Sequence, residues 1–527
     1  MYSAILERSQ QTPKTAPIQT LSDRAAGATV GGLFSARARV SPHAVALENG
    51  TRLLTFRELD ERARRMANWL RAQGIQHGDR VAVLSENRLE YIDLLFAAAR
   101  IGAIVACQNW RLAPPELQHC LDLVSPRLLL ASERHSGLLQ KVETRDALVR
   151  VFDSTFNDDV AASTHDALPV DVGTEDALLI LYTSGTTGVP KGAVISHRAE
   201  LARRATRIAN WNLQVGEVWV IWTPLFHMSG ADDLMSALLS GARVVLIDGF
   251  DVERIVQEVA TRPIGWLRLM PGTIVSFLEE MRRVGVPSPS VRLCGGLVDL
   301  LPSHQVGEVS SLLKSTFLNS FGSTEVGTIL TGLIPPGVVP PDASKEETTF
   351  SEVRLVDKEG CDVLHGVPGE MVVRSATMFS GYWQMPELNA TEFRDGWFRT
   401  GDLFIRQPDD RLRFVDRNKY LIKSGGENIY PAEIERVIGA DSRVLDVVVV
   451  RQQDDHWGEV PVAFVVRKDQ SLDREMLQRR CREALAGYKQ PKQIHFVADR
   501  FLPRSTTGKI QRHEVERMLA SGTVMTE

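Results

Sequence analysis

Short apolar runs that alternate with helix-length segments constrain the fold of this chain more than any other feature. Helical patterns at residues 55–74 and 90–101 alternate with strand-like runs at 80–84 and 127–131, and the alternation resumes from residue 198 to residue 327. Thr55 is expected to cap the first of these helices, with Glu58 as its capping-box partner. Strands that alternate with helices of this length predict a layered α/β architecture.

The length of the chain predicts more than one domain. A chain of 527 residues exceeds what one ordinary core supports. The polar segment 1–29 is expected to be flexible, and the pattern becomes richer in strands beyond about residue 343. It changes again near 416–419, before about a hundred residues that could form a small domain. We therefore predict a large α/β domain over 30–418, with layered sheets plus a β-rich part, and a small α+β domain over 419–527.

Composition excludes several function classes. A net charge of −5 gives no electrostatic reason to expect nucleic acid or an anionic membrane surface as partner. No stretch has the length of an apolar membrane span, and the N-terminal segment has no hydrophobic run of the signal type. The five cysteines are scattered without a close pair, which argues against a disulfide framework or zinc site and fits a reducing cytoplasm.

A glycine- and threonine-rich stretch follows the buried run 177–181. Residues 183–192 read Thr-Ser-Gly-Thr-Thr-Gly-Val-Pro-Lys-Gly. Backbone N–H groups, hydroxyls and the mobile charge of Lys191 together suit a polyphosphate. The stretch is not a Walker A motif, because Pro190 precedes the lysine and no Ser or Thr follows it. Taken alone, it would more often be a flexible surface loop.

Four other residues share this chemistry. Glu325 offers a hard oxygen for magnesium, Asp402 lies on a short turn and could accept ribose hydroxyls, and Arg417 and Lys509 supply positive charge. Each also has a structural interpretation, such as a helix-start carboxylate, an Asx turn or a surface salt bridge. The significance lies in the combination.

The combination, in this order, resembles the adenylate-forming superfamily of acyl-CoA synthetases, adenylation domains and beetle luciferases. The motifs are 183–192, 321–325 (Phe-Gly-Ser-Thr-Glu), 398–402 (Phe-Arg-Thr-Gly-Asp), 416–417 with 424–428 (Ser-Gly-Gly-Glu-Asn), and 503–509 (Pro-Arg-Ser-Thr-Thr-Gly-Lys). The likeness runs from about residue 34 to residue 512. It implies an AMP-forming carboxylate–CoA ligase that uses ATP, Mg²⁺ and coenzyme A.

The resemblance assigns a role to each motif. Catalytic roles fall to Lys509, which bridges the acid carboxylate and the α-phosphate, and to Thr324, Glu325 and His227, with Glu325 as the magnesium ligand. Coenzyme A would pass Ser424, Gly425 and Gly426, and Lys419 would be the hinge of a mobile C-terminal domain. ATP and AMP would be bound by Thr183, Ser184, Gly185, Thr186, Thr187, Gly188, Lys191, Gly295, Gly296, Ser320, Phe321, Gly322, Asp402 and Arg417.

Three positions depart from the usual family pattern. Asp416 stands where glycine is usual, Tyr420 where an acidic residue is common, and Phe321 replaces the more frequent tyrosine. None of these changes removes a catalytic group, although Asp416 could alter how Arg417 is held.

The acid pocket is less readable. His227 matches a position that often gates it, and Asp232 and Asp233 are interpreted as carboxylates in the first turn of a helix over 232–239. Small residues, among them Gly230, Gly295 and Gly296, are expected to leave room for a bulky acid. Fatty, aromatic, and alicyclic or steroid-derived acids all stay open. So do a homodimer, a carrier-protein thiol as acceptor, and a non-catalytic nucleotide-binding regulator.

Overall fold

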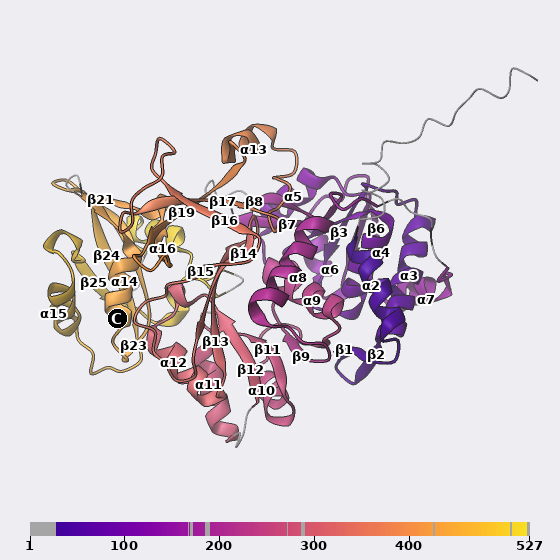
Figure 1. Ribbon diagram of the computed structural model, residues 1–527. Coiled ribbons are helices and arrows are strands. Elements are labelled where there is room, and N and C mark those ends of the chain that lie inside the picture. Colours follow the sequence, from indigo (N-terminus) through magenta and orange to yellow (C-terminus); the bar gives the residue numbers. More distant parts are fainter. Residues whose placement is uncertain are drawn as a thin grey trace, which may run out of the picture.

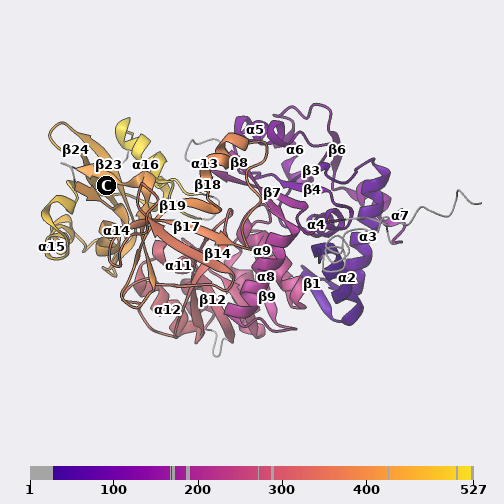
Figure 2. The same ribbon diagram turned by 45° about the horizontal axis from the view of Figure 1, so that its top comes forward.

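The computed structural model describes residues 28–166, 168, 172–184, 190–270, 272–285, 290–424, 427–505 and 508–523. Its strands form four sheets, and Figure 1 shows the C-terminal sheet at the opposite end of the molecule from helices α2 and α3. Figure 2 shows the same separation after rotation. Within the described residues, no helix combines the length and the apolar character that a membrane crossing requires.

The first sheet is six-stranded, with the order β6-β5-β3-β4-β7-β8. All its neighbours pair in parallel except β7 and β8, which are antiparallel. Its strands are β3 (Arg80–Leu84), β4 (Ile104–Cys107), β5 (Leu128–Ala131), β6 (Leu148–Val151), β7 (Ala177–Ser184) and β8 (Pro190–Ser196). The helices of this part are α2 (Val30–Val40), α3 (Phe56–Ala72), α4 (Leu89–Ile101), α5 (Pro114–Val124), α6 (Ser136–Leu139) and α7 (Ser154–Ala162).

The second sheet has nine strands in the order β15-β14-β13-β12-β11-β9-β10-β1-β2. They are β1 (Val45–Asn49), β2 (Arg52–Thr55), β9 (Val218–Ile221), β10 (Arg243–Leu246), β11 (Ile264–Arg268), β12 (Val291–Gly296), β13 (Thr316–Ser323), β14 (Gly327–Ile334) and β15 (Glu346–Glu347). Its helices are α8 (His197–Trp211), α9 (Met228–Ser240), α10 (Val252–Thr261), α11 (Ile274–Val284) and α12 (Ser303–Leu313).

The nine-stranded sheet is buried on both faces, as its apolar strands require. Successive residues of β9 enter different cores. Trp219 joins the core that contains α4 and α9, whereas Val220 joins the core that contains α10, α11 and α12. The first core also takes Val81 and Val83 from β3 of the six-stranded sheet. Helices α4 and α9 therefore lie in a layer between the two sheets.

The remaining strands form two smaller sheets. The third sheet contains β16 (Ser351–Val356), β17 (Gly369–Ser375), β18 (Phe393–Arg394), β19 (Trp397–Arg406) and β20 (Leu412–Arg417), with α13 (Pro386–Glu392) beside it. The 3₁₀ turn η3 (Asn418–Tyr420) leads to the fourth sheet. That sheet contains β21 (Ile422–Ser424), β22 (Glu427–Ile429), β23 (Val444–Asp454), β24 (Gly458–Arg467) and β25 (Gln493–Phe496), with α14 (Pro431–Gly439), α15 (Arg474–Ala484) and α16 (Arg512–Ala520).

The predicted α/β class is confirmed, and so is the capping box at the start of α3. The Thr55 backbone N–H donates to Glu58 Oε2 at 2.8 Å, and Glu58 N–H donates to Thr55 Oγ1 at 3.3 Å. Helix α7 begins at Ser154, in a polar part of the chain. Asp153 caps it by accepting from Phe156 N–H at 2.8 Å, and Phe156 is buried. A polar composition concealed this short amphipathic helix.

Candidate active site

The phosphate-loop candidate connects two paired strands. β7 and β8 are antiparallel, with Thr183 opposite Lys191. Residues Gly185, Thr186, Thr187 and Gly188 lie outside the described residues, as does the side chain of Ser184. Lys191 is buried, with Nζ 5.0 Å from the centre of the Tyr382 ring. The lysine therefore has a fixed place at the base of the loop.

Tyr382 joins Lys191 to Glu325. Its hydroxyl donates to Glu325 Oε1 at 3.0 Å, and its backbone forms a bridge with Ala193 of β8. The Phe379 N–H donates to the carbonyl of Glu325 at 2.7 Å. Burial raises the pKa of Tyr382, and the neighbouring Glu325 raises it further, so the phenol stays protonated. Sequence reasoning missed Tyr382, because no pattern in residues 379–383 shows that they pair with β8.

Asp402 and Arg417 stand directly opposite each other on β19 and β20. Arg417 Nε donates to Asp402 Oδ1 at 2.9 Å, and Asp402 is 2% exposed. Burial raises the pKa of Asp402 from its ordinary value, although Arg417 opposes the shift. The structure therefore brings together the two residues that were predicted to contact a ribose.

Lys509 lies close enough to this pair to sense its charges. Burial lowers the pKa of Lys509 to about 8, and Arg417 lowers it further, while Asp402 and Asp299 oppose the shift. A tight turn holds the lysine, since Ser505 N–H donates to the Lys509 carbonyl at 2.7 Å and Lys509 N–H donates to Ser505 Oγ at 3.2 Å. The charges of two residues of the third sheet thus act on a lysine from the C-terminal segment.

The predicted adenine-binding residues lie on two neighbouring strands, β12 and β13. Phe321 packs in an aromatic cluster with Phe404 and Phe414, at centroid distances of 4.8 and 5.9 Å. Ser320 Oγ lies 3.5 Å from the carbonyl of Gly296. A side chain at Gly322 would place its Cβ 2.0 Å from the carbonyl oxygen of Gly327. Glycine is therefore required where the backbone passes this closely.

The expectation that small residues leave open space for a bulky acid is wrong for three glycines. A Cβ at Gly296 would lie 2.2 Å from the Leu269 carbonyl oxygen, and one at Gly295 would lie 2.5 Å from that of Leu318. A Cβ at Gly230 would lie 2.2 Å from the carbonyl oxygen of Pro224. These glycines allow backbones to approach each other, so an acid pocket must be built by other side chains.

His227 caps helix α9. Its Nδ1 accepts from Ser229 N–H at 3.2 Å and lies 2.9 Å from Ser229 Oγ. Burial lowers the pKa of His227 to about 3, and the positive charges of Lys509 and Arg268 lower it further. The imidazole is therefore neutral, and because Nδ1 accepts, its proton is on Nε2.

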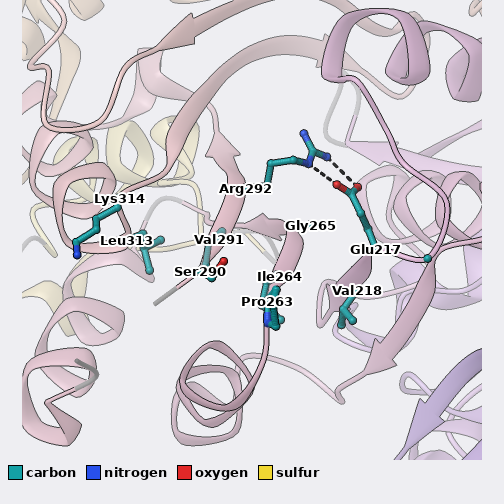
Figure 3. A pocket seen from close by; sticks show the side chains of 11 residues that line it. Glu217, Val218, Pro263, Ile264, Gly265, Ser290, Val291, Arg292, Leu313 and Lys314 are labelled. Carbon is teal, nitrogen blue, oxygen red and sulfur yellow. Dashed lines mark hydrogen bonds and ion pairs between the residues drawn. The ribbon is translucent and has the colours of Figure 1, made fainter. Parts of the chain in front are cut away.

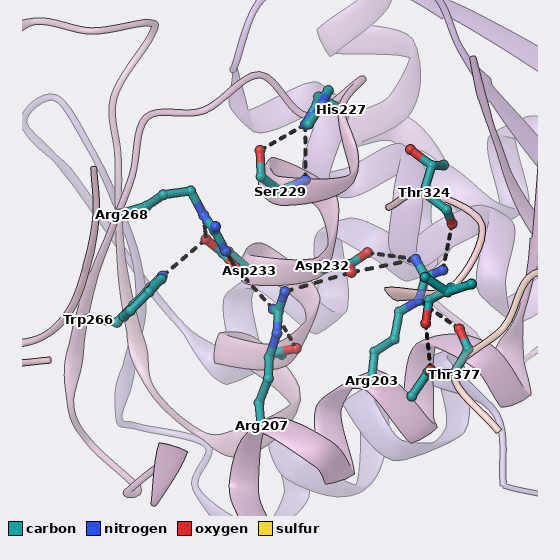
Figure 4. Close-up of polar contacts among 12 residues, drawn as sticks. Arg203, Arg207, His227, Ser229, Asp232, Asp233, Trp266, Arg268, Thr324 and Thr377 are labelled. Atoms are coloured by element: carbon teal, nitrogen blue, oxygen red, sulfur yellow. Dashed lines mark hydrogen bonds and ion pairs between the residues drawn. The ribbon is translucent and has the colours of Figure 1, made fainter. Parts of the chain in front are cut away.

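Asp232 and Asp233 belong to a buried charge network (Figure 4). Because α9 begins at Met228, they lie in its second turn, and their predicted place in the first turn is wrong. Asp232 Oδ1 accepts from Arg203 Nη1 at 3.1 Å. Asp233 accepts from Arg268 Nε at 2.6 Å and from Arg268 Nη2 at 2.7 Å. Three residues complete the network: Trp266, Arg207 and Glu200.

Arg203 connects this network to the turn that carries Thr324 and Glu325. Its Nη2 donates to the Thr324 carbonyl at 2.8 Å, and its Nε donates to the Thr377 carbonyl at 3.0 Å. Sequence reasoning missed this arginine. The available signal was the pair Arg203 and Arg207, four residues apart on one face of α8, where arginines bury only when they are paired.

The hinge candidate Lys419 lies in η3, between the third and fourth sheets. Its carbonyl accepts from Arg451 Nη2 at 2.8 Å, and a pocket of about 520 Å³ opens beside it. Asp416, a departure from the family pattern, makes contacts across this junction. Its Oδ1 lies 3.2 Å from Arg512 Nη1, and its Oδ2 accepts from Ala432 N–H at 2.9 Å. Ser424 is buried, and Gly425 and Gly426 lie outside the described residues.

Another pocket, of about 430 Å³, opens at the N-terminal ends of strands β9, β11 and β12 (Figure 3). Three charged residues line it, and two of them, Glu217 and Arg292, pair with each other, whereas the third, Lys314, is exposed. None of the predicted site residues lines it. We therefore place the candidate site at the C-terminal ends of these strands, where ligands bind in open α/β sheets.

The described residues contain no group of three or more His, Cys, Asp or Glu that could hold a metal. Glu325 alone fits a more limited role. Magnesium takes one or two carboxylates and completes its shell with water and nucleotide phosphates. The carboxylate beside Lys191 and Tyr382 is suited to that arrangement.

Comparisons with known proteins agree with this geometry. Residues 34–383 match the family model for AMP-binding enzymes, and 433–509 match the model for their C-terminal domain. A feruloyl-CoA synthase of Amycolatopsis sp is 35% identical, with 91% of this chain and 97% of that protein covered. An indoleacetate–CoA ligase of Aromatoleum aromaticum is 32% identical, with 93% and 98% covered. The o-succinylbenzoate CoA synthetase of Bacillus subtilis, solved with ATP and magnesium, is 26% identical, with 92% and 98% covered and a TM-score of 0.78.

Replacing Arg203 by Met should lower the stability of the fold. The change leaves Asp232 buried with less compensation, so we expect a loss of about 3–5 kcal/mol in the free energy of unfolding, measured by urea with tryptophan fluorescence. Arg374→Met is the control, because Arg374 and its partner Glu352 are 54% and 59% exposed. That loss should stay below about 1 kcal/mol. Equal losses in the two variants would contradict a special role for the buried network.

Tyr382→Phe should weaken nucleotide binding without harming the fold. The ring beside Lys191 remains, but Glu325 loses the hydroxyl donor. A hydrogen bond to a charged group supports an expected drop of roughly tenfold in ATP affinity with magnesium, measured by titration calorimetry. Tyr91→Phe, on α4, is the control for loss of a buried phenol. A similar drop in both variants would show that Tyr382 has no specific effect on the site.

Proposed function

The chain belongs to the family of AMP-binding enzymes, and on this premise we propose that it converts an aromatic carboxylic acid into its CoA thioester through an enzyme-bound acyl-adenylate. It is an AMP-forming carboxylate–CoA ligase that uses ATP and coenzyme A. The aromatic class is supported by relatives named for feruloyl, indoleacetate and succinylbenzoate groups. Fatty and alicyclic acids are the alternatives that experiment must compare.

The observation that carries the proposal is the paired Asp402 and Arg417, whose charges both act on the buried ammonium of Lys509. In the first step a carboxylate oxygen attacks the α-phosphorus of ATP. The new acyl–phosphate bond forms as the α–β phosphoanhydride breaks, and diphosphate leaves. The Lys509 ammonium would stabilise the charge that develops at that phosphorus, an effect typically worth ~10²–10³ in rate.

The other residues would bind and orient the nucleotide. Asp402, held by Arg417, would accept the ribose hydroxyls, and Phe321 would stack on adenine with Gly295, Gly296, Ser320 and Gly322 near its edge. The Thr324 hydroxyl would lie near the α-phosphate. Thr183, Lys191 and the loop between them would hold the β- and γ-phosphates. Glu325 would hold magnesium, which supplies positive charge that neutralises the phosphates when bound.

In the second step the CoA sulfur attacks the acyl carbon, the carbon–oxygen bond to AMP breaks, and the thiol proton is released. Lys509 and the pantetheine arm need the same face of the adenylate, so we infer a rotation about Lys419 between the steps. The rotation would present Ser424, Gly425 and Gly426 to the arm. A homodimer and a cytoplasmic location remain predictions from the sequence.

The test is acid-dependent diphosphate release over a panel of aromatic, fatty and alicyclic acids, with and without coenzyme A, with thioester detected by mass spectrometry. Lys509→Ala should lose diphosphate release by about 10²–10³ yet still convert a supplied acyl-adenylate into thioester. Lys314→Gln, an exposed lysine lining the pocket of Figure 3, is the control and should retain both steps. Equal losses in both half-reactions of Lys509→Ala would refute the two-step assignment. Diphosphate release without thioester would favour a carrier-protein acceptor.

The pH dependence of adenylation should report Lys509. The lysine is charged below its pKa of about 8 and neutral above it. Since the cation is the active form, kcat/KM for diphosphate release should fall about tenfold per pH unit above pH 8, because kcat/KM reflects the free enzyme. Lys509→Arg should be slower but lack this decline, because arginine stays charged. A decline that persists in Lys509→Arg would assign it to another group.

A further inference from the structure

Arg268 is the outer residue of the buried charge network. It is the last residue of β11, and its side chain is 12% exposed, whereas Arg203, Arg207, Asp232 and Asp233 are at most 2% exposed. Figure 4 shows its guanidinium beside the Asp233 carboxylate, which Trp266 also contacts. Arg268 is therefore the member of the network that a ligand can reach.

Asp233 is fully used as an acceptor. Its Oδ2 accepts from Arg268 Nε at 2.6 Å and from Trp266 Nε1 at 3.1 Å. Its Oδ1 accepts from Arg268 Nη2 at 2.7 Å and lies 3.0 Å from Arg207 Nη1. Four donors occupy the approximately four acceptor sites of a carboxylate. A substrate amine or hydroxyl therefore finds no acceptor on Asp233.

Arg268 has donors left over. A guanidinium carries five N–H groups, and the contact with Asp233 uses Nε and Nη2. Nη1 makes no hydrogen bond with any residue in the part of the chain that the structure describes. The fork on Asp233 and the Trp266 ring, 5.2 Å from Cζ, hold the guanidinium plane in one orientation. Nη1 is thus a charged, oriented donor.

The surroundings of His227 are positively charged. Lys509, Arg268 and Arg111 all act on the imidazole as cations, whereas Asp233, already saturated, is the anion that opposes them. Arg268 and Lys509 thus both lie near the residue that was predicted to gate the acid pocket. One cation for the reacting carboxylate and a second, oriented cation suit an acid with two oxygen functions.

We propose that Arg268 determines substrate specificity by donating from Nη1 to a second oxygen group on the acid, a hydroxyl or a carboxylate distant from the carboxylate that is activated. The inference rests on the proposed ligase function and narrows its substrate class. The preferred substrates are aromatic acids that carry an oxygen substituent, and unsubstituted acids are poor substrates because they leave the Arg268 donor without an acceptor in a dehydrated site. A site built to hydrogen-bond a polar group rejects analogues that lack it.

The experiment compares cinnamate with its 2-, 3- and 4-hydroxy and 2-, 3- and 4-carboxy derivatives. The wild-type enzyme should prefer at least one oxygenated acid over cinnamate by roughly 10–100-fold in kcat/KM for diphosphate release. Comparison of the hydroxy with the carboxy derivatives identifies which oxygen group Arg268 binds. Binding of the same acids in the presence of α,β-methylene-ATP, which cannot release diphosphate, gives a readout independent of turnover.

Arg268→Gln should reduce the preference, measured as the ratio of kcat/KM for the oxygenated acid to kcat/KM for cinnamate, to less than about threefold. Arg268→Lys keeps a positive charge beside Asp233, so it tests whether a loss of preference comes from misfolding. It should lose the preference as well, because its single ammonium nitrogen cannot contact Asp233 and also occupy the position of Nη1. The control Arg292→Gln removes another fork on a carboxylate, Glu217, at the far end of the strands, and should keep the wild-type preference.

Three outcomes are decisive. A wild-type enzyme without preference for any oxygenated acid overturns the role of Arg268, and so does a preference that survives in both Arg268 variants. Absence of diphosphate release with every acid of the wider panel would instead overturn the proposed ligase function. The inference and its premise can therefore fail separately.

Discussion

The buried guanidinium of Arg203 contacts three segments that are far apart in the sequence. It donates to Asp232 on α9, to the carbonyl of Thr324 after β13, and to the carbonyl of Thr377 after β17. Removing a charge from water is costly, so a buried arginine is tolerated only where its donors are used. The position of the Thr324 turn, and with it Glu325, therefore depends on the packing of α8 against α9.

The site is completed from the other end of the chain. Lys509 follows the last strand of the fourth sheet, yet it senses Asp402 and Arg417 of the third sheet. Contacts of Asp416 with Arg512 and with the Ala432 N–H help to hold the two sheets in this arrangement. Burial and Arg417 lower the pKa of Lys509 more than the carboxylates of Asp402 and Asp299 raise it, so a further anion at this place would be stabilised by the lysine. The acid and the α-phosphate would supply that charge.

Two residues show why parts of the site escaped sequence reasoning. Tyr382 contacts both Lys191 and Glu325, but it does so through a backbone bridge to Ala193 that has no signature in residues 379–383. Asp233 had a reasonable local explanation as a carboxylate in the first turn of a helix. The helix begins four residues earlier than expected, at Met228, so Asp233 lies in its second turn and is buried. There its carboxylate accepts hydrogen bonds from Arg268 and Trp266.

The sequence by itself determined the α/β class, the position of most strands and helices, and the identities of the charged residues that could serve a nucleotide. These follow from local periodicity and from chemistry that a few adjacent residues carry, as in the Thr55–Glu58 cap. The tertiary structure alone decided which of those residues meet. Whether Gly296 opens a pocket or permits contact with the Leu269 backbone depends on the neighbouring strand. Whether Asp233 faces a ligand or an arginine depends on helix packing, since contacts between distant segments leave no periodic trace in the chain.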